Sequence, residues 1–233
     1  MDWFQKILEI DTRLFLYLNN FHNDLWDTIM VMVTHKETWM PFYIVIIIFL
    51  IKNYRSKSVS IILFLALTIL LSDQISVLIK ESVGRLRPVY NPEIEHLVHN
   101  VLRKGKEFGF VSSHATNSFS VFIFTSLIFK NRNYSLLLLF WAILFSYSRI
   151  YLGVHYPLDI ICGAGLGLLI GFTTYKIMMF VENRYFIVRT PRIEKTRFNP
   201  IQSMIILLVF SVSALTTVIV ISVLHYYNCI AIP

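Results

Sequence analysis

Long apolar runs separated by short polar stretches dominate the chain beyond its first 36 residues. They cover residues 39–52, 57–79, 116–129, 134–153, 157–181 and 201–227. Most approach the roughly 20 residues that an α-helix needs to cross a bilayer, and they lack the period-two alternation of a membrane β-barrel. Because backbone polar groups in hydrocarbon must bond within their own segment, these runs are predicted to be helices. The pattern therefore predicts an all-α membrane protein, a bundle of six transmembrane helices.

The N-terminal segment, residues 1–36, has a different pattern. Apolar positions are mixed there with Asp11, Asp24 and Asp27, and a polar pair at 19–20 interrupts the segment. A helix with one apolar and one polar face lies in the membrane interface rather than across it. We therefore expect two short amphipathic surface helices ahead of the bundle.

Composition supports the membrane assignment. Hydrophobic residues make up 56% of the 233 positions and charged residues 15%, whereas an average soluble domain has about 25% charged residues. The composition therefore favours an integral membrane protein.

The distribution of basic residues orients the bundle. Threading six helices places the connections 52–57, 130–133 and 182–200 on one face, and both termini with the segments 80–115 and 149–157 on the other. Lys and Arg are divided almost evenly, but three on the second face are candidates for chemistry. Without those three, the positive-inside rule places the first face in the cytoplasm and 80–115 outside. This distribution accounts for the net charge of +7 without nucleic-acid binding.

The outward segment 80–115 begins with two cations. Lys80 and Arg87 are seven residues apart, and Pro88 follows. A helix that continues past Lys80 until the proline would place both cations on one face, where they could bind one ligand. The alternative is that both side chains only reach toward lipid headgroups from the end of a span.

The same segment ends in a cluster of hydroxyl and amide residues. Ser112 and Ser113 come before an apolar helix, with His114 beside them and Asn117 one turn later. This composition is typical of a helix N-cap, and the free N–H groups of a helix start attract anions. Alternatively, one serine is only a cap and His114 is an interfacial histidine.

A third polar group lies between two apolar runs. Arg149 and His155 precede Pro157, which suits the first position of a helix, and Asp159 would fall in its first turn. The Asp159 carboxylate could then hold one ring nitrogen of His155 and leave the other to attack. A purely structural pair at a helix start is the alternative.

The three groups thread to the same membrane face, and together they supply what phosphoryl transfer without a metal requires. That reaction needs cations for the phosphate oxygens, a nucleophile and an acid for the leaving alkoxide. A metal site at His114, His155 and Asp159 is less favoured because three cations are expected nearby. An anion transporter is less favoured because paired broken helices are missing.

The three motifs also carry a family resemblance. The pattern Lys80-x6-Arg87-Pro88, Ser112-Ser113-His114 and Ser148-Arg149-x5-His155-x3-Asp159 resembles the signature of the type 2 phosphatidic acid phosphatase (PAP2) superfamily of integral membrane lipid phosphatases. The resemblance is strong over residues 80 to 181. Two departures stand out: Val111 and Ser113 occupy positions where the family usually has proline and glycine.

The resemblance implies a role for each motif residue. His155 would be the nucleophile that forms a phosphohistidine, and Asp159 would orient it. His114 would protonate the leaving group and later activate water. The phosphate would be held by a set of cations, a hydroxyl and a backbone N–H, namely Lys80, Arg87, Ser112, Ser113 and Arg149.

The expected function is metal-independent and cofactor-independent removal of phosphate from a membrane lipid. Undecaprenyl diphosphate is the first candidate by fold-level analogy alone, and lipid A, phosphatidylglycerol phosphate and phosphatidate are the others. Lipid-to-lipid phosphotransfer and a non-enzymatic anion transporter are the alternative functions. The protein is expected in the inner (cytoplasmic) membrane, with its site on the periplasmic or extracellular face and with a phosphorylated lipid and the bilayer as partners; the sequence does not indicate an oligomeric state.

The implied domain organisation has four parts. They are interfacial helices at 1–36, a five-span catalytic core at 37–181, a basic cytoplasmic loop at 182–200 and an additional transmembrane helix at 201–233.

Overall fold

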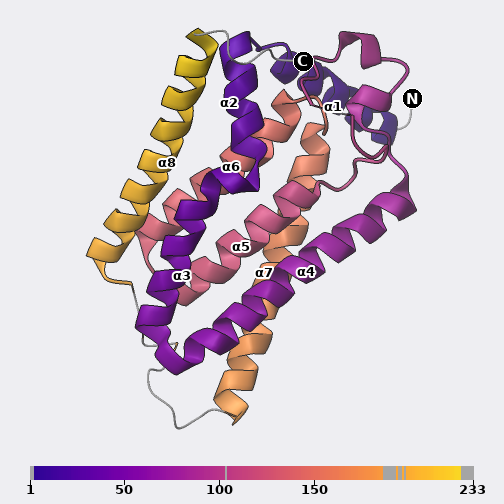
Figure 1. The fold of residues 1–233 in the computed structure, drawn as a ribbon. Helices are drawn as coiled ribbons and strands as arrows, with labels where there is room; N and C mark the ends of the chain where they lie inside the picture. The colour runs from indigo at the N-terminus through magenta and orange to yellow at the C-terminus, as the bar shows by residue number, and fades with distance from the viewer. Residues whose placement is uncertain (1–2, 103, 186–192, 194–195, 197, 227–233) are drawn as a thin grey trace.

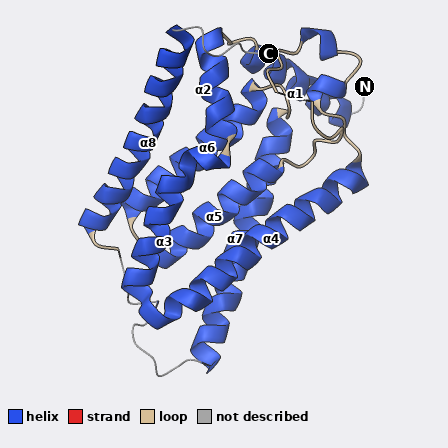
Figure 2. Ribbon diagram, viewed as in Figure 1, coloured by secondary structure: helices blue, strands red, loops and turns tan. Residues whose placement is uncertain are grey.

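The fold is described by a computed structural model that covers residues 3–102, 104–185, 193, 196 and 198–226. Within these residues the chain forms α-helices joined by 3₁₀ turns, with no β-strand (Figure 2). The α-helices are α1 (Trp3–Asn19), α2 (Asp24–Thr34), α3 (Met40–Tyr54), α4 (Ser58–Val83), α5 (Ser113–Phe129), α6 (Arg132–Tyr151), α7 (Pro157–Tyr185) and α8 (Pro200–Tyr226). The 3₁₀ turns are η1 (Lys36–Trp39), η2 (Arg55–Lys57), η3 (Pro88–Tyr90) and η4 (Glu95–Leu97). The predicted all-α architecture is confirmed for the described residues.

Four helical segments among the described residues are long and apolar enough to cross a membrane. They are Lys36–Val83, Arg132–Tyr151, Pro157–Tyr185 and Pro200–Val220. The first of them contains both α3 and α4, and the chain reverses direction between these helices at η2 (Figure 1). The 17-residue α5 is not among the four. The structure thus agrees with an integral membrane protein, and the count of six crossings stays a prediction.

Helices α5 and α7 pack closely along their length. Gly163, Gly167 and Gly171 of α7 recur every four residues and face the backbone of α5. A Cβ on Gly167 would lie 2.3 Å from the Thr116 carbonyl oxygen, far inside van der Waals contact. Small residues allow this approach, and it holds the first turns of α5 and α7 side by side.

The N-terminal helices attach to the end of the bundle that carries the three motifs. Helix α1 buries Asp11, Phe15 and Asn19, while it exposes apolar side chains such as Trp3 and Ile10. Helix α2 packs against α6 and α8 and leads through η1 into α3 (Figure 1). Both predicted helices therefore exist, and their position on the membrane surface stays a prediction.

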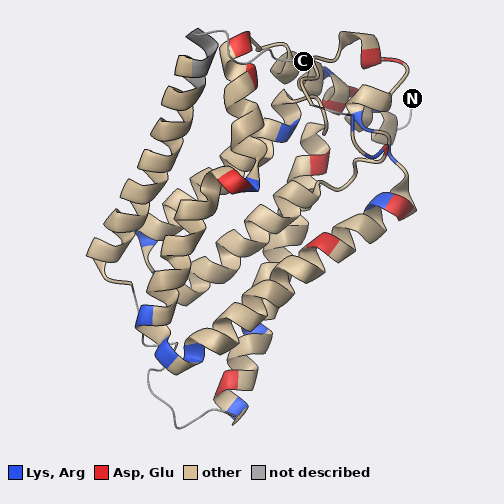
Figure 3. Cartoon of the chain, viewed as in Figure 1, with Lys and Arg blue, Asp and Glu red and all other residues tan. Residues whose placement is uncertain are grey.

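Basic residues gather at the end of the bundle opposite α1. Lysines and arginines of the connections after α3 and α5 and of the last turn of α7 lie there (Figure 3). Most of the basic loop predicted at 182–200, and residues 227–233 of the predicted segment 201–233, lie outside the described residues.

Candidate active site

His155 and Asp159 lie at the start of α7. The helix begins at Pro157, as predicted, so Asp159 falls in its first turn. Asp159 Oδ2 lies 3.3 Å from His155 Nδ1 and accepts a hydrogen bond from the Tyr156 N–H at 3.0 Å. Asp159 is fully buried and His155 is 2% exposed. The predicted pair is therefore formed, and Asp159 holds the imidazole on its Nδ1 side.

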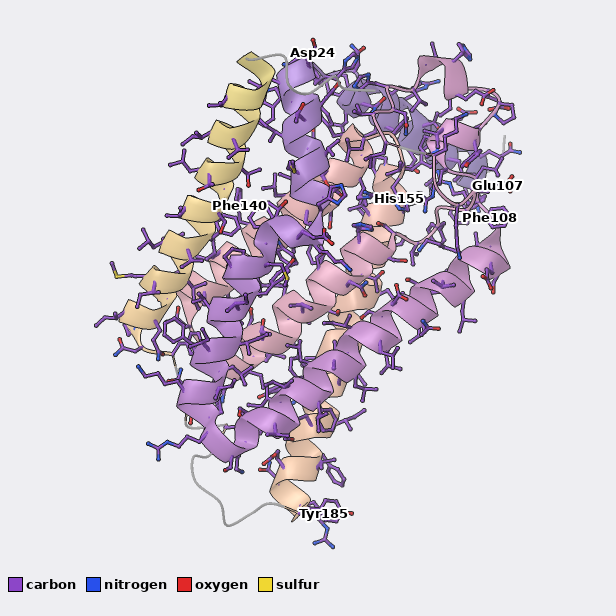
Figure 4. All side chains as sticks on the ribbon, viewed as in Figure 1. Asp24, Glu107, Phe108, Phe140, His155 and Tyr185 are labelled. Atoms are coloured by element: carbon purple, nitrogen blue, oxygen red, sulfur yellow. The ribbon has the colours of Figure 1, made fainter. Side chains whose placement is uncertain are left out.

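Three cations act on His155, and they come from three separate parts of the chain. Burial, together with the positive charges of Arg149, Arg87 and Lys80, holds the pKa of His155 well below its ordinary value, against a hydrogen bond with the Gly109 backbone. The imidazole is consequently neutral near pH 7, as a nucleophile must be. Figure 4 shows His155 within the motif-bearing end of the bundle, far from Tyr185 at the opposite end.

Arg87 reaches the site from extended backbone and not from a helix. Helix α4 ends directly before Gly84, which adopts a left-handed φ of +63°. The Arg87 N–H then donates to the Glu107 carbonyl at 2.9 Å, and its Nε donates to the Phe108 carbonyl at 3.2 Å. The expectation that α4 continues toward Pro88 is wrong, because glycine ends the helix earlier. The positive charges of Lys80 and Arg87 nevertheless both act on His155.

Ser112 links the starts of α5 and α7. It is the N-cap of α5, as predicted, with its Oγ 3.5 Å from the Ala115 N–H. Its own N–H donates to the Asp159 carbonyl at 3.0 Å, and its side chain is fully buried. Ser112 thereby fixes the position of the α5 N-terminus relative to His155 and Asp159.

Ser113 links α5 to α4. Its hydroxyl is hydrogen-bonded to Lys80 Nζ and lies 2.7 Å from Ser76 Oγ. Among the described non-glycine residues, only Arg55 and Lys130 have a positive φ. The backbone at Ser113 therefore does not require glycine, and the serine adds a hydroxyl that holds the Lys80 ammonium.

His114 lies on α5 and Arg149 on α6, and these two helices pack against each other. The His114 ring stacks on Phe145, one turn before Arg149 on α6, with 5.3 Å between ring centroids. Arg149 is 8% exposed, and its guanidinium donates to Thr34 Oγ1 at 2.7 Å. Its Nε has no hydrogen-bond partner in the described part of the chain.

Two further charged residues belong to the site and were not assigned to it from the sequence. Arg85 donates to Asp159 Oδ1 at 2.9 Å and to Asp11 Oδ2 at 2.7 Å, and its guanidinium lies 4.1 Å from the Tyr156 ring centroid. Asp11 Oδ1 accepts the Leu158 N–H at 2.8 Å, which satisfies a free donor at the start of α7. Burial raises the pKa of Asp11, and the hydrogen bond from Arg85 opposes this effect.

The sequence carries only weak signals for these residues. Asp11 shares one face of α1 with Phe15 and Asn19 at a spacing of four, which marks a buried carboxylate in retrospect. Arg85 follows Gly84 in the first motif. The sequence around Thr34 carries no signal that predicts its contact with Arg149, which is 115 residues away.

The resulting site is suited to a phosphate monoester. It presents a buried imidazole whose pKa is held low, a second imidazole on α5, and three cations around the first that make no ion pair with a carboxylate in the described part of the chain. Among the described residues, no group of three or more His, Cys, Asp or Glu side chains is arranged as a metal site. Lys80, Arg87 and Arg149 are groups that can bind phosphate oxygens.

Comparison with known proteins identifies relatives along most of the chain. The sequence profile of the PAP2 superfamily matches residues 61–182. A lipid A 4'-phosphatase from Bacteroides thetaiotaomicron is 42% identical, over 72% of this chain and 77% of that protein. A second, from Porphyromonas gingivalis, is 35% identical over 78% of each chain. The undecaprenyl-diphosphatase BcrC of Bacillus subtilis is 28% identical over 66% of this chain and 76% of that protein.

A solved structure shares the fold. The crystal structure of Aquifex aeolicus LpxE superposes with a TM-score of 0.57 at 25% identity, over 71% of this chain and 94% of that chain.

Proposed function

Since the chain belongs to the PAP2 superfamily and is a lipid phosphatase, we propose that it removes phosphate from an acylated sugar phosphate of the lipid A type. The similarity to two lipid A 4'-phosphatases supports this substrate class. Undecaprenyl diphosphate, the first candidate from the sequence, becomes the second candidate, supported by the weaker similarity to BcrC.

The proposed reaction has two steps. The free nitrogen of His155 attacks phosphorus, the bond from phosphorus to the lipid oxygen breaks, and His114 protonates that oxygen. Water, deprotonated by His114, then attacks the phosphohistidine and releases inorganic phosphate. Lys80, Arg87 and Arg149, with the Ser112 hydroxyl and the Ser113 N–H, bind the phosphate oxygens in both steps.

The proposed topology places this site at the outer face of the inner membrane. Helices α3 to α8 cross the bilayer, and α1 lies at its surface with apolar side chains exposed toward lipid. The basic end of the bundle, opposite His155, faces the cytoplasm by the positive-inside rule (Figure 3).

The observation that carries the proposal is the buried His155, which lies 3.3 Å from Asp159 through Nδ1 and Oδ2 and close to the positive charges of Arg149, Arg87 and Lys80. It predicts that purified protein releases phosphate from lipid A in the presence of EDTA. His155→Ala should reduce release by at least about 10³-fold, because it removes the nucleophile. Phosphate release from detergent-solubilised lipid A and undecaprenyl diphosphate measures this.

The matched control is His96→Ala, a histidine exposed in the loop before α5. It should release phosphate at the rate of the unchanged protein. Unchanged release by His155→Ala would refute the mechanism. A labelled lipid product without free phosphate would instead show transfer to a second lipid.

A further inference from the structure

An apolar cavity opens directly beside the proposed site. Its volume is about 650 Å³, and His114 forms part of its wall. Most of the remaining wall is hydrophobic and comes from α3 to α6, including Ile47, Leu65, Ile69 and Val121. Since the cavity is apolar and reaches a proposed catalytic residue, it suits the lipid part of the substrate next to the phosphate.

The rim of this cavity is polar, which a hydrocarbon chain alone does not require. Thr34, His35, Lys36 and Glu37 form the junction between α2 and α3 and line the cavity. The last three are exposed. An acidic and a basic residue of this junction lie partway along the bundle, away from the charges at its ends (Figure 3).

The junction is tied to the phosphate site by a direct contact. Thr34, the last residue of α2, accepts the hydrogen bond from Arg149. His35 and Glu37 lie 3.6 Å apart through Nδ1 and Oε2, whereas Lys36 has no ion-pair partner among the described residues. A headgroup held by Arg149 would therefore lie close to these three side chains.

Hydrogen-bonding groups continue along the cavity wall. The Asn117 Oδ1 and the Trp141 Nε1 atoms are buried and lack a partner in the described part of the chain. Asn117 follows His114 by three residues on α5, or roughly 4.5 Å along the axis. Trp141 precedes Arg149 by eight residues on α6, or roughly 12 Å. Unpaired buried polar atoms are costly, so a ligand with its own polar atoms suits this wall.

These observations separate two classes of lipid phosphate. A polyprenyl phosphate carries all of its hydrogen-bonding atoms in the phosphate groups, and the rest is hydrocarbon. An acylated sugar phosphate also carries hydroxyl groups and acyl carbonyls within the first few bonds. Beyond the phosphate groups themselves, only the second of these two classes offers hydrogen-bonding partners to the junction.

We propose that His35, Lys36 and Glu37 form a subsite that binds the sugar hydroxyls and acyl carbonyls of an acylated sugar phosphate and thereby selects it over polyprenyl phosphates. This inference rests on the proposed function. Lys36 donates to carbonyl or hydroxyl oxygens, and Glu37 accepts from hydroxyls. The three residues determine specificity and take no part in the chemical steps.

The test compares kcat/KM for lipid A with kcat/KM for undecaprenyl diphosphate in the same detergent. We expect Lys36→Ala and Glu37→Gln each to lower the ratio of these two values about tenfold, mainly through KM for lipid A, because each loses one charge-assisted hydrogen bond. The matched control is Lys52→Ala, an exposed lysine near the other end of α3. It should keep the ratio of the unchanged protein.

The possible results are distinguishable. An unchanged ratio in both junction variants, or an equal decrease in Lys52→Ala, would overturn the subsite. Release from undecaprenyl diphosphate but not from lipid A by the unchanged protein would overturn the subsite and leave the phosphatase activity intact. No release from either lipid would overturn the proposed function, and the subsite with it.

Discussion

The two ends of the helix bundle both bury charge, but they arrange it differently. At the end away from His155, Lys57 Nζ lies 2.8 Å from Glu182 Oε2, and both side chains are buried. At the other end, Lys80, Arg87 and Arg149 make no ion pair among the described residues. They bond to a serine hydroxyl, a backbone carbonyl and a threonine hydroxyl instead.

Carboxylates are present near these three cations, but Arg85 binds them. Asp11 and Asp159 both pair with its guanidinium. A buried unpaired cation is costly. The Lys57–Glu182 pair avoids this cost, so charge at that end of the bundle is arranged for stability. At the His155 end, Lys80, Arg87 and Arg149 are left available for an anionic ligand. The predictions below alter one end at a time.

The largest effect, a loss of stability, is expected from breaking the buried Lys57–Glu182 ion pair. Lys57→Met leaves the buried Glu182 carboxylate without the ammonium group that it pairs with, and such a change typically costs about 3–5 kcal/mol. The variant should unfold at a clearly lower temperature in detergent than the unchanged protein, and thermal unfolding followed by circular dichroism measures this. Specific activity of the folded fraction should be retained, because the pair lies at the opposite end from His155.

A double variant provides the control for this prediction. Lys57→Met with Glu182→Gln removes both charges and should recover most of the lost stability. If the single variant were as stable as the unchanged protein, the Lys57–Glu182 pair would not stabilise the fold.

No loss of stability is expected when a cation is removed at the end of the bundle that carries His155. Arg149→Met removes a buried cation that pairs with no carboxylate of the described residues, so the unfolding temperature of this variant should be equal to or above that of the unchanged protein. Phosphate release should fall about 10²–10³-fold, because one group that stabilises the transition-state charge is lost. The two readouts are phosphate release and thermal unfolding on the same preparation.

The matched control, Arg132→Met, lies at the other end of α6 and is exposed. It should leave both quantities unchanged. A strongly destabilised Arg149→Met would mean that this arginine mainly serves the fold, against the comparison of the two ends.

The sequence predicted those parts of the site that depend on local spacing. Pro157 and Asp159 share the first turn of α7, so the pairing of Asp159 with His155 follows from four residues of sequence. The cap at Ser112 is equally local. Local rules failed at Gly84, where glycine ends α4 before Pro88 could.

The parts that sequence reasoning missed depend on tertiary contacts. Asp11 meets Arg85, 74 residues away, and the Leu158 N–H, 147 residues away, because α1 packs at this end of the bundle. The bond from Arg85 to Asp159 likewise joins residues that lie 74 positions apart. Period and composition describe one helix at a time, so they do not show which helices meet. The helical fold was predictable because a hydrocarbon environment leaves the backbone few choices.

The smallest predicted effect concerns how the unpaired cations Lys80, Arg87 and Arg149 act on the pKa of His155. Burial and the neighbouring cations hold the pKa of His155 well below its ordinary value, so activity on the acid side should persist below pH of about 6.5. Below that pH the unfolded chain binds a proton at His155 more readily than the folded protein, so folded stability should also decline as pH falls. Arg87→Gln removes one positive charge and raises the pKa of His155. The acid limb of the kcat/KM profile should therefore move to higher pH by roughly one unit, and the maximum of the profile should be lower.

Titration of the substrate phosphate affects both enzymes equally and cancels in the comparison. Arg184→Gln, at the opposite end of the bundle, should leave the limb in place. A limb that stays fixed in Arg87→Gln would show that burial alone sets the protonation of His155, and that the unpaired cations act on the substrate and not on the nucleophile.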